Sequence, residues 1–202
     1  MSYQEKRVRV KRYGRMQRRS PLLTTVPSAK ENRTMRLHKL AAAGMEAMGE
    51  ALLSDLGIEL RIVSGWRAHR WKSWEHYEET LIRKYGSVKK GRRWLAYASP
   101  HETGLAMDIG VGGLWPSSRT AAAQRKQPLH EWLVEHAWEY GWHPYKNEPW
   151  HWEFPISKEA WKTGERDIDE AIAFGLEDEY DDYDEDDQVI EDNFLDEGDV
   201  QD

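Results

Sequence analysis

Residues 99–108 read SPHETGLAMD, and this stretch decides both the predicted fold and the predicted site. From residue 106 to residue 111, apolar side chains alternate with small or polar ones, which predicts a strand with one core face and one open face. Asp108 is expected on the open face. Gly104 tolerates a turn in the preceding loop, so that His101 reaches the same point in space. The stretch therefore offers an imidazole and a carboxylate to one cation.

A second stretch, residues 148–154, reads EPWHWEF and alternates aromatic residues with His151 and Glu153. His151 is the natural third ligand. Catalytic zinc sites use three protein ligands and keep one position open, whereas structural sites are closed by four ligands, often cysteines. The chain contains no cysteine. Glu148 is the predicted general base, because Pro149 keeps the chain extended and lets the carboxylate lie beside the metal without binding it.

These residues match a known pattern. SPHETGLAMD fits SxHxxGxAxD, EPWHWE fits ExWH, and residues 64–67 read SGWR. Over about residues 33–155 the chain resembles the LAS metallopeptidases, the group of lysostaphin and of the D-alanyl-D-alanine carboxypeptidases and dipeptidases. The branch it is most similar to contains the vancomycin-resistance type D-Ala-D-Ala carboxypeptidases and related phage endolysin peptidases. The resemblance implies a zinc site and a catalytic pair, with His101, Asp108 and His151 as ligands, Glu148 as the base and Arg67 at the oxyanion.

The resemblance also implies a substrate, the stem peptide of peptidoglycan. D-Ala-D-Ala carboxypeptidase activity is the first expectation, and endolysin-like cleavage within the stem peptide is the alternative. A non-catalytic protein that binds cell-wall material without cutting it is the alternative from a different functional class. Ser99 and Trp66 are the candidate substrate contacts. Trp66 and Phe154 stand where the family more often has tyrosine, which bears on specificity and leaves the metal ligands untouched.

Charge divides the 202 residues into three parts. Residues 1–20 hold eight Lys or Arg and one Glu, a net charge of +7, whereas residues 177–202 hold fifteen Asp or Glu and no Lys or Arg. The predicted organisation is a flexible basic arm over 1–27, a zinc peptidase domain over 28–165 and a disordered acidic tail over 166–202. The arm contains no recognisable nucleic-acid reading module, so no specific nucleic-acid partner is predicted.

Further expectations concern assembly and location. The basic N-terminus is not followed by an apolar run of signal-peptide length, and no segment is long enough to span a membrane. Synthesis in the cytoplasm, action on the cell wall after release or export, and a monomeric state are expected.

The remaining periodicities predict a small α+β domain, in which helices pack on one face of a short antiparallel sheet and the zinc lies on the open face. Ser28 or Asn32 is expected to cap the first helix. A basic loop at 89–93 is expected over the site. The predicted helices are 35–56, 71–85 and 128–140, and the predicted strands include 58–63 and 106–111.

Overall fold

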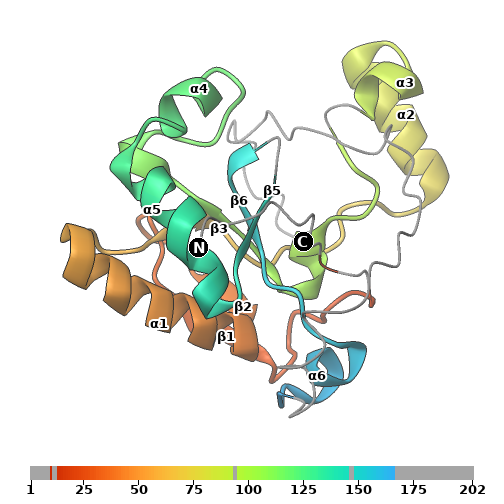
Figure 1. Ribbon diagram of the computed structural model, residues 1–202. Helices are drawn as coiled ribbons and strands as arrows, with labels where there is room; N and C mark the ends of the chain where they lie inside the picture. The colour runs from red at the N-terminus through yellow and green to blue at the C-terminus, as the bar shows by residue number, and fades with distance from the viewer. Residues whose placement is uncertain (1–9, 11–12, 93–94, 146–147, 167–202) are drawn as a thin grey trace, which may run out of the picture.

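The structure, a computed structural model, describes residues 10, 13–92, 95–145 and 148–166. Its centre is a four-stranded antiparallel sheet in the order β3-β4-β6-β5 (Figure 1). A second, two-stranded antiparallel sheet pairs β1 with β2. The strands are β1 Leu23–Val26, β2 Met35–His38, β3 Ile62–Ser64, β4 Ala106–Ile109, β5 His143–Tyr145 and β6 Glu148–Glu153.

Helices occur together with these two antiparallel sheets, which confirms the predicted α+β class. The longest, α1, packs along the sheet together with α5 and the 3-10 turn η3. Trp132 of α5 donates a hydrogen bond from Nε1 to Oδ2 of Asp55 in α1 at 2.9 Å. The α-helices are α1 Lys39–Leu56, α2 Trp74–Tyr85, α3 Val88–Gly91, α4 Ala121–Gln124, α5 Pro128–His136 and α6 Lys158–Thr163, and the 3-10 turns are η1 Pro100–Thr103, η2 Val111–Gly113 and η3 Ala137–Tyr140.

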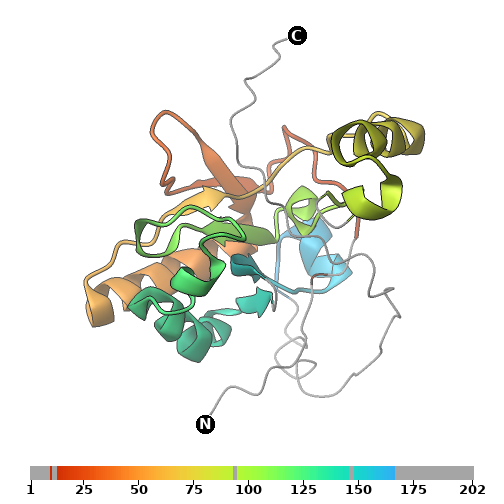
Figure 2. The same ribbon diagram turned by 90° about the horizontal axis from the view of Figure 1, so that it is seen from above.

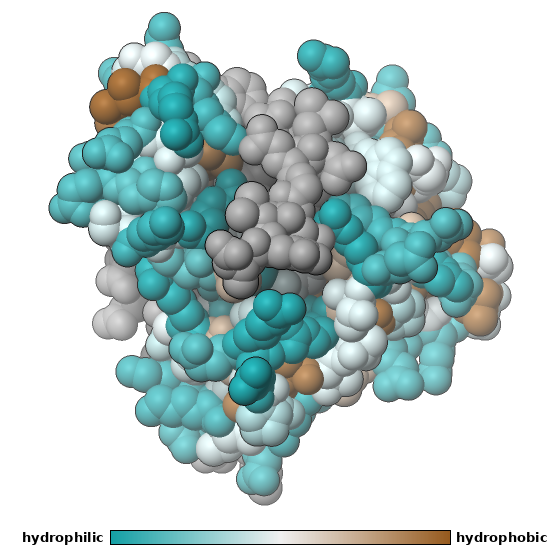
Figure 3. Space-filling model, turned by 180° about the vertical axis from the view of Figure 1, so that it is seen from behind, coloured by the Kyte–Doolittle hydropathy of each residue, from teal (hydrophilic) through white to brown (hydrophobic). Residues whose placement is uncertain are grey.

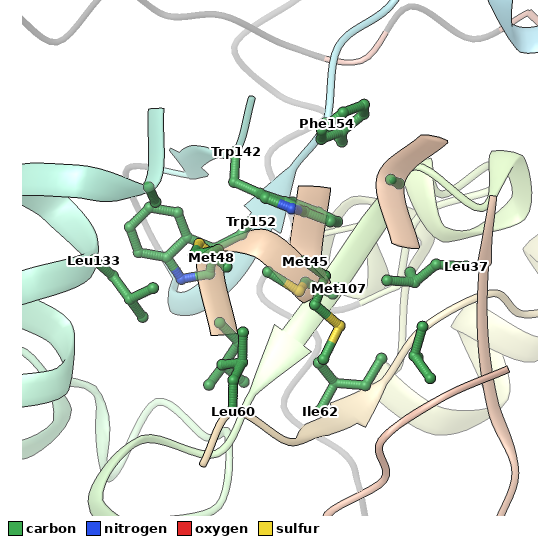
Figure 4. Close-up of a cluster of buried hydrophobic side chains, with 14 of the residues drawn as sticks. Leu37, Met45, Met48, Leu60, Ile62, Met107, Leu133, Trp142, Trp152 and Phe154 are labelled. Atoms are coloured by element: carbon green, nitrogen blue, oxygen red, sulfur yellow. The ribbon is translucent and has the colours of Figure 1, made fainter. Parts of the chain in front are cut away.

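The main hydrophobic core lies between α1 and the central sheet (Figure 4). Met45 and Met48 of α1 belong to the same cluster as Met107 of β4, because helical residues three or four apart share one face. Trp152 pairs with Met107 across β4 and β6, so the two side chains share the core face of the sheet. Burial of each such side chain contributes about 1.5–3 kcal/mol. The core therefore fixes which face of the sheet is left for polar residues.

Helices α2 and α3 form a separate unit that lies away from α1 and α5 in both ribbon views (Figures 1 and 2). Its own small core consists of Trp71, Tyr77, Leu81 and Leu95. The predicted helix 71–85 begins three residues later than expected, at Trp74, because Ser73 caps it by accepting a hydrogen bond from the amide of His76. It ends at Gly86 as predicted.

The prediction of one helix from Met35 was wrong. Residues 35–38 form β2, which pairs with β1 from Leu23↔His38 to Val26↔Met35. The N-cap of α1 is His38, and Nδ1 of its ring accepts a hydrogen bond from the amide of Leu40 at 3.3 Å. Ser28 and Asn32 therefore do not cap this helix. The partner strand supplies the backbone hydrogen bonds of residues 35–38, and helical periodicity alone gave no sign of that partner.

Four further boundaries differ from the predictions. The strand expected at 106–111 ends at Ile109, because residues 111–113 form the 3-10 turn η2. The strand expected at 58–63 is shorter and later, β3 at Ile62–Ser64, because only these residues pair with β4. The helix expected at 128–140 splits into α5 and the 3-10 turn η3, and Gly141 ends it with a φ of 83°. The short helix α3 begins at Val88 and includes residues 89–91 of the expected basic loop, and Arg93 lies outside the described residues.

The segment 13–27, part of the expected basic arm, contacts the domain at several points in the described residues. It contributes β1, and the amide of Met16 donates to the carbonyl of Glu102 at 2.8 Å. The acidic tail from residue 167 lies outside the described residues. In the space-filling view, hydrophilic side chains cover most of the face shown and hydrophobic ones form small separate patches (Figure 3). Among the described residues, no helix has the length and apolar character needed to cross a membrane.

Candidate metal centre

The central sheet brings Asp108 and His151 together as a cross-strand pair. Asp108 of β4 lies opposite His151 of β6, and the neighbouring pair Met107↔Trp152 occupies the core face. Because side chains alternate along a strand, Asp108 and His151 share the other face. Nδ1 of His151 lies 3.0 Å from Oδ1 of Asp108, and both side chains are buried. Two predicted ligands therefore meet because of strand register alone.

His101 arrives from the 3-10 turn η1, immediately before β4. Ser99 and Glu102 form a capping box at its start, and the Ser99 hydroxyl accepts from the amide of His101 at 3.4 Å. Gly104 ends the turn with a φ of 78°, as the predicted turn requires. A Cβ at Gly104 would lie 3.0 Å from the backbone nitrogen of His38, so a larger residue is disfavoured by both conformation and space.

The three predicted ligands form one cluster. His101, Asp108 and His151 each offer a ligand atom, and these atoms lie within 4.8 Å of one another. The rings of His101 and His151 meet edge to face at 5.0 Å between centroids. Nε2 of His101 lies 3.3 Å from Oδ1 of Asp108, yet within the described part of the chain this buried atom has no hydrogen-bond partner. A buried imidazole nitrogen with an unused lone pair beside a carboxylate fits a metal ligand set.

Each histidine is also held from behind. Nδ1–H of His101 donates to the carbonyl of Gly65 at 2.7 Å, which leaves Nε2 free to bind a cation. Nε2–H of His151 donates to Oε1 of Glu153 at 3.2 Å, which turns Nδ1 toward Asp108. Histidine ligands of metals commonly donate their second N–H to a carbonyl or carboxylate in this way. Both rings are thus oriented for metal binding by atoms of the protein.

The pKa values of the cluster follow from burial and from these neighbours. Burial, followed by the positive charge of Arg67, lowers the pKa of His101, so its ring is neutral and able to bind a metal. Although burial opposes ionisation, His101 and His151 hold the pKa of Asp108 well below its usual range. Burial likewise opposes protonation of His151, but hydrogen bonds to Asp108 and Glu153 raise its pKa well above the ordinary value. A metal held through Nδ1 of His151 would therefore displace a proton from that ring.

Two predicted catalytic residues lie at the ends of these strands. Arg67 follows β3, its amide donates to the carbonyl of His101 at 3.3 Å, and its charge acts on the His101 ring. Glu148 is buried at the start of β6 and does not belong to the three-residue ligand cluster. Regular alternation would put Glu148 on the face opposite His151. The register shift at Tyr145, which pairs with Glu148, interrupts that alternation.

The two predicted substrate contacts lie near the same loop. Ser99 is half-buried at the cap of η1. Trp66 is also half-buried, its Nε1–H donates to the carbonyl of Met16 at 3.1 Å, and the Arg36 guanidinium lies 4.7 Å from the centre of its ring. Trp66 therefore contacts other residues of the protein through both its ring face and its indole N–H.

Sequence reasoning missed the atoms that orient the histidines. The sequence motifs give Glu153 no orienting role, although its spacing of two residues from His151 already puts both side chains on one face of a strand. The SGWR motif likewise gives no sign that the carbonyl of Gly65 orients His101. A Cβ on Gly65 would lie 2.5 Å from the carbonyl oxygen of Arg36, so the glycine lets the backbone approach closely enough to hold His101.

The comparison with protein families decides the assignment. The sequence profile of the VanY family, described as D-alanyl-D-alanine carboxypeptidase, matches residues 34–157. The chain belongs to the VanY family. This membership confirms the predicted resemblance, and together with the His–Asp–His cluster it identifies the protein as an enzyme, a zinc metallopeptidase. The matched region contains the three candidate ligands, Glu148 and Arg67.

Solved structures with a similar fold include members of the same family. A variant of the vancomycin-resistance D,D-pentapeptidase VanY from a VanB-type resistance cassette, in complex with Zn(II), is 18% identical, with a TM-score of 0.46, and the match covers 79% of this chain and 94% of that one. VanYB in complex with D-alanine-D-alanine has the same identity and TM-score, with coverage of 84% and 98%. The LD-carboxypeptidase LdcB is 17% identical, with a TM-score of 0.35 and coverage of 75% and 95%. No curated protein matches the chain. The family match, and not these structures, carries the assignment.

Proposed function

We infer that this VanY-family protein removes the terminal D-alanine from peptidoglycan stem peptides that end in D-Ala-D-Ala. The observation that carries this proposal is the buried His101, Asp108 and His151 cluster inside a region that matches the D-alanyl-D-alanine carboxypeptidase profile. A site of three ligands leaves a coordination position for chemistry, whereas a structural zinc site is closed by four. The reaction would take place on cell-wall material.

In the proposed site the three clustered residues hold the metal. His101 would bind through Nε2 and His151 through Nδ1, since Gly65 and Glu153 occupy the other ring nitrogens. When bound, zinc acts as a Lewis acid on a carbonyl and makes water a stronger nucleophile at neutral pH. Burial of the cluster strengthens every electrostatic interaction within it.

The other roles belong to side chains of this chain. Glu148 accepts a proton from the attacking water and passes it to the leaving amine as the C–N bond breaks, which is the usual function of a general base and acid. Arg67 stabilises the negative charge that develops on the former carbonyl oxygen, and loss of one such group typically costs about 10²–10³ in rate. Two observations support these roles: the burial of Glu148 and the effect of the Arg67 charge on His101. Ser99 and Trp66 are retained as proposed substrate contacts.

The test compares two substrates. The zinc-loaded protein is incubated with a stem pentapeptide that ends in D-Ala-D-Ala and, separately, with intact crosslinked peptidoglycan, and the products are weighed by mass spectrometry. Release of one alanine from the pentapeptide supports the proposal, and Glu148→Gln serves as the control for contaminating peptidases. Cleavage only at an internal bond would show that the protein is an endopeptidase and not a carboxypeptidase. Binding to peptidoglycan with no cleavage of either substrate would indicate a non-catalytic wall-binding protein.

A further inference from the structure

The N-terminal segment touches both halves of the metal centre. Residues 10 and 13–18, here called the N-terminal strap, precede residue 34, where the match to the VanY profile begins. The family match therefore does not account for them. The strap reaches two carboxylates, Glu153 and Glu102. The carboxylate of Glu153 contacts the predicted ligand His151, whereas Glu102 directly follows the predicted ligand His101 in the sequence.

The first contact is with the carboxylate that orients His151. The amide of Val10 donates to Oε2 of Glu153 at 2.6 Å, while Oε1 of Glu153 accepts from Nε2–H of His151 at 3.2 Å. The two oxygens of Glu153 therefore bridge the strap and the ligand. Both Val10 and Glu153 are buried, so the hydrogen bond is shielded from competing water.

The second contact is with the turn that carries His101. Arg15 pairs through Nε with Oε2 of Glu102 at 3.2 Å, and the amide of Met16 donates to the Glu102 carbonyl at 2.8 Å. The Glu102 carboxylate also accepts from the amide of Ser99 at 3.2 Å and lies 3.0 Å from Nδ1 of His69. Glu102 is the direct neighbour of His101 in η1, so these contacts fix the position of that turn.

The strap is itself anchored at three further points. The hydroxyl of Tyr13 donates to the carbonyl of Ile156 at 2.7 Å. The carbonyl of Met16 accepts from Nε1–H of Trp66 at 3.1 Å, and the carbonyl of Arg18 accepts from the Arg36 guanidinium at 2.6 Å. These contacts attach residues 13, 16 and 18 of the strap to the domain. A carboxylate held on both sides has less freedom to turn away from the histidine that it orients.

We propose that the N-terminal strap is a positioning element of the metal centre, in which the Val10 amide holds Glu153 in the orientation that directs Nδ1 of His151 to the metal. The proposal deepens the proposed function, because it rests on the same zinc site. It does not depend on which peptide bond is cut.

The key variant removes one hydrogen-bond donor. Val10→Pro lacks the backbone N–H and cannot donate to Glu153. Loss of an outer partner of a metal ligand usually costs about 10- to 100-fold in metal affinity, and Val10→Pro is expected at the lower end, about tenfold. Val10→Ala is the matched control, since it keeps the N–H and removes only buried side-chain atoms. It should lower thermal stability and leave zinc affinity unchanged.

The zinc affinity of each full-length variant is measured by competition with a chelating dye. Thermal unfolding of the metal-free variants checks that each one is folded. Glu153→Gln supplies a second, independent perturbation, because a neutral amide is a poorer partner for the N–H of His151. If Val10 acts through Glu153, the effect of Val10→Pro should be smaller in the Glu153→Gln background, which a double-mutant cycle detects.

Two results would overturn the proposal. One is wild-type zinc affinity in folded Val10→Pro, and the other is an equal loss of affinity in the presence and absence of Glu153→Gln. Failure of the wild-type protein to bind zinc would instead refute the metal site itself. The two failures are therefore distinguishable without any measurement of peptidase activity.

Discussion

The most informative single substitution is Gly65→Ala, because it adds one carbon at a crowded point behind the metal centre. The carbonyl of Gly65 accepts the hydrogen bond from Nδ1–H of His101 at 2.7 Å. An ideal Cβ on this residue would lie 2.5 Å from the carbonyl oxygen of Arg36. That oxygen also accepts from the amide of Trp66 at 2.6 Å, so neither backbone segment can move without disturbing the other.

The expected magnitude follows from these distances. Ordinary van der Waals contact begins at about 3.4 Å, so the two segments must separate by about 0.9 Å (3.4 minus 2.5). Overpacking of this kind typically costs about 1–3 kcal/mol. In a protein of this length, each kcal/mol shifts Tm by about 2–4 °C, which gives a loss of about 2–12 °C. Displacement of the Gly65 carbonyl should also lower zinc affinity by about tenfold, the usual effect of losing an orienting partner.

Two assays test this, thermal unfolding of the metal-free protein and zinc titration against a chelator. Gly49→Ala is the matched control, because Gly49 lies inside α1 and its added Cβ would be 3.5 Å from the nearest atom, Cβ of Leu60. That change should raise stability by about 0.5–1 kcal/mol, since alanine favours a helix. If Gly65→Ala kept both the wild-type Tm and the wild-type zinc affinity, the role assigned to the Gly65 carbonyl would be wrong.

Three other outcomes are expected. Glu148→Gln should retain zinc and the wild-type Tm, while kcat on the stem pentapeptide falls by about 10²–10⁴, the usual contribution of a general base. A near-native kcat would show that another residue is the base. His101→Ala should reduce the zinc content of the purified protein, measured by atomic absorption, and full retention would remove His101 from the ligand set. Burial lowers the pKa of His38 in the folded protein, so the free energy of unfolding should fall as the pH drops below about 6.5. Urea titrations at pH 7 and pH 5 measure this fall. The free energy of unfolding of His38→Asn should decrease less between these two pH values than that of the wild-type protein.

The sequence alone predicts the candidate ligands and the strands that carry two of them. The alternation around Asp108 and His151 predicts two strands with the ligands on one face, and the register Asp108↔His151 has that result. Gly104 predicts the turn before β4, and its φ of 78° confirms it. These signals are local, because strand periodicity and a left-handed glycine act over a few residues.

Tertiary structure decided the features that depend on distant partners. Residues 35–38 have a pattern compatible with a helix, yet residues 23–26 supply the paired backbone groups that make them strand β2. The carbonyl of Gly65 holds His101 from 36 positions away along the chain. Every residue has a main-chain carbonyl, so the sequence does not show which of these carbonyls will accept a hydrogen bond from a distant side chain. The amide of Val10 reaches Glu153 across 143 positions, and only the folded chain, by packing its N-terminal strap against β6, brings these two atoms together.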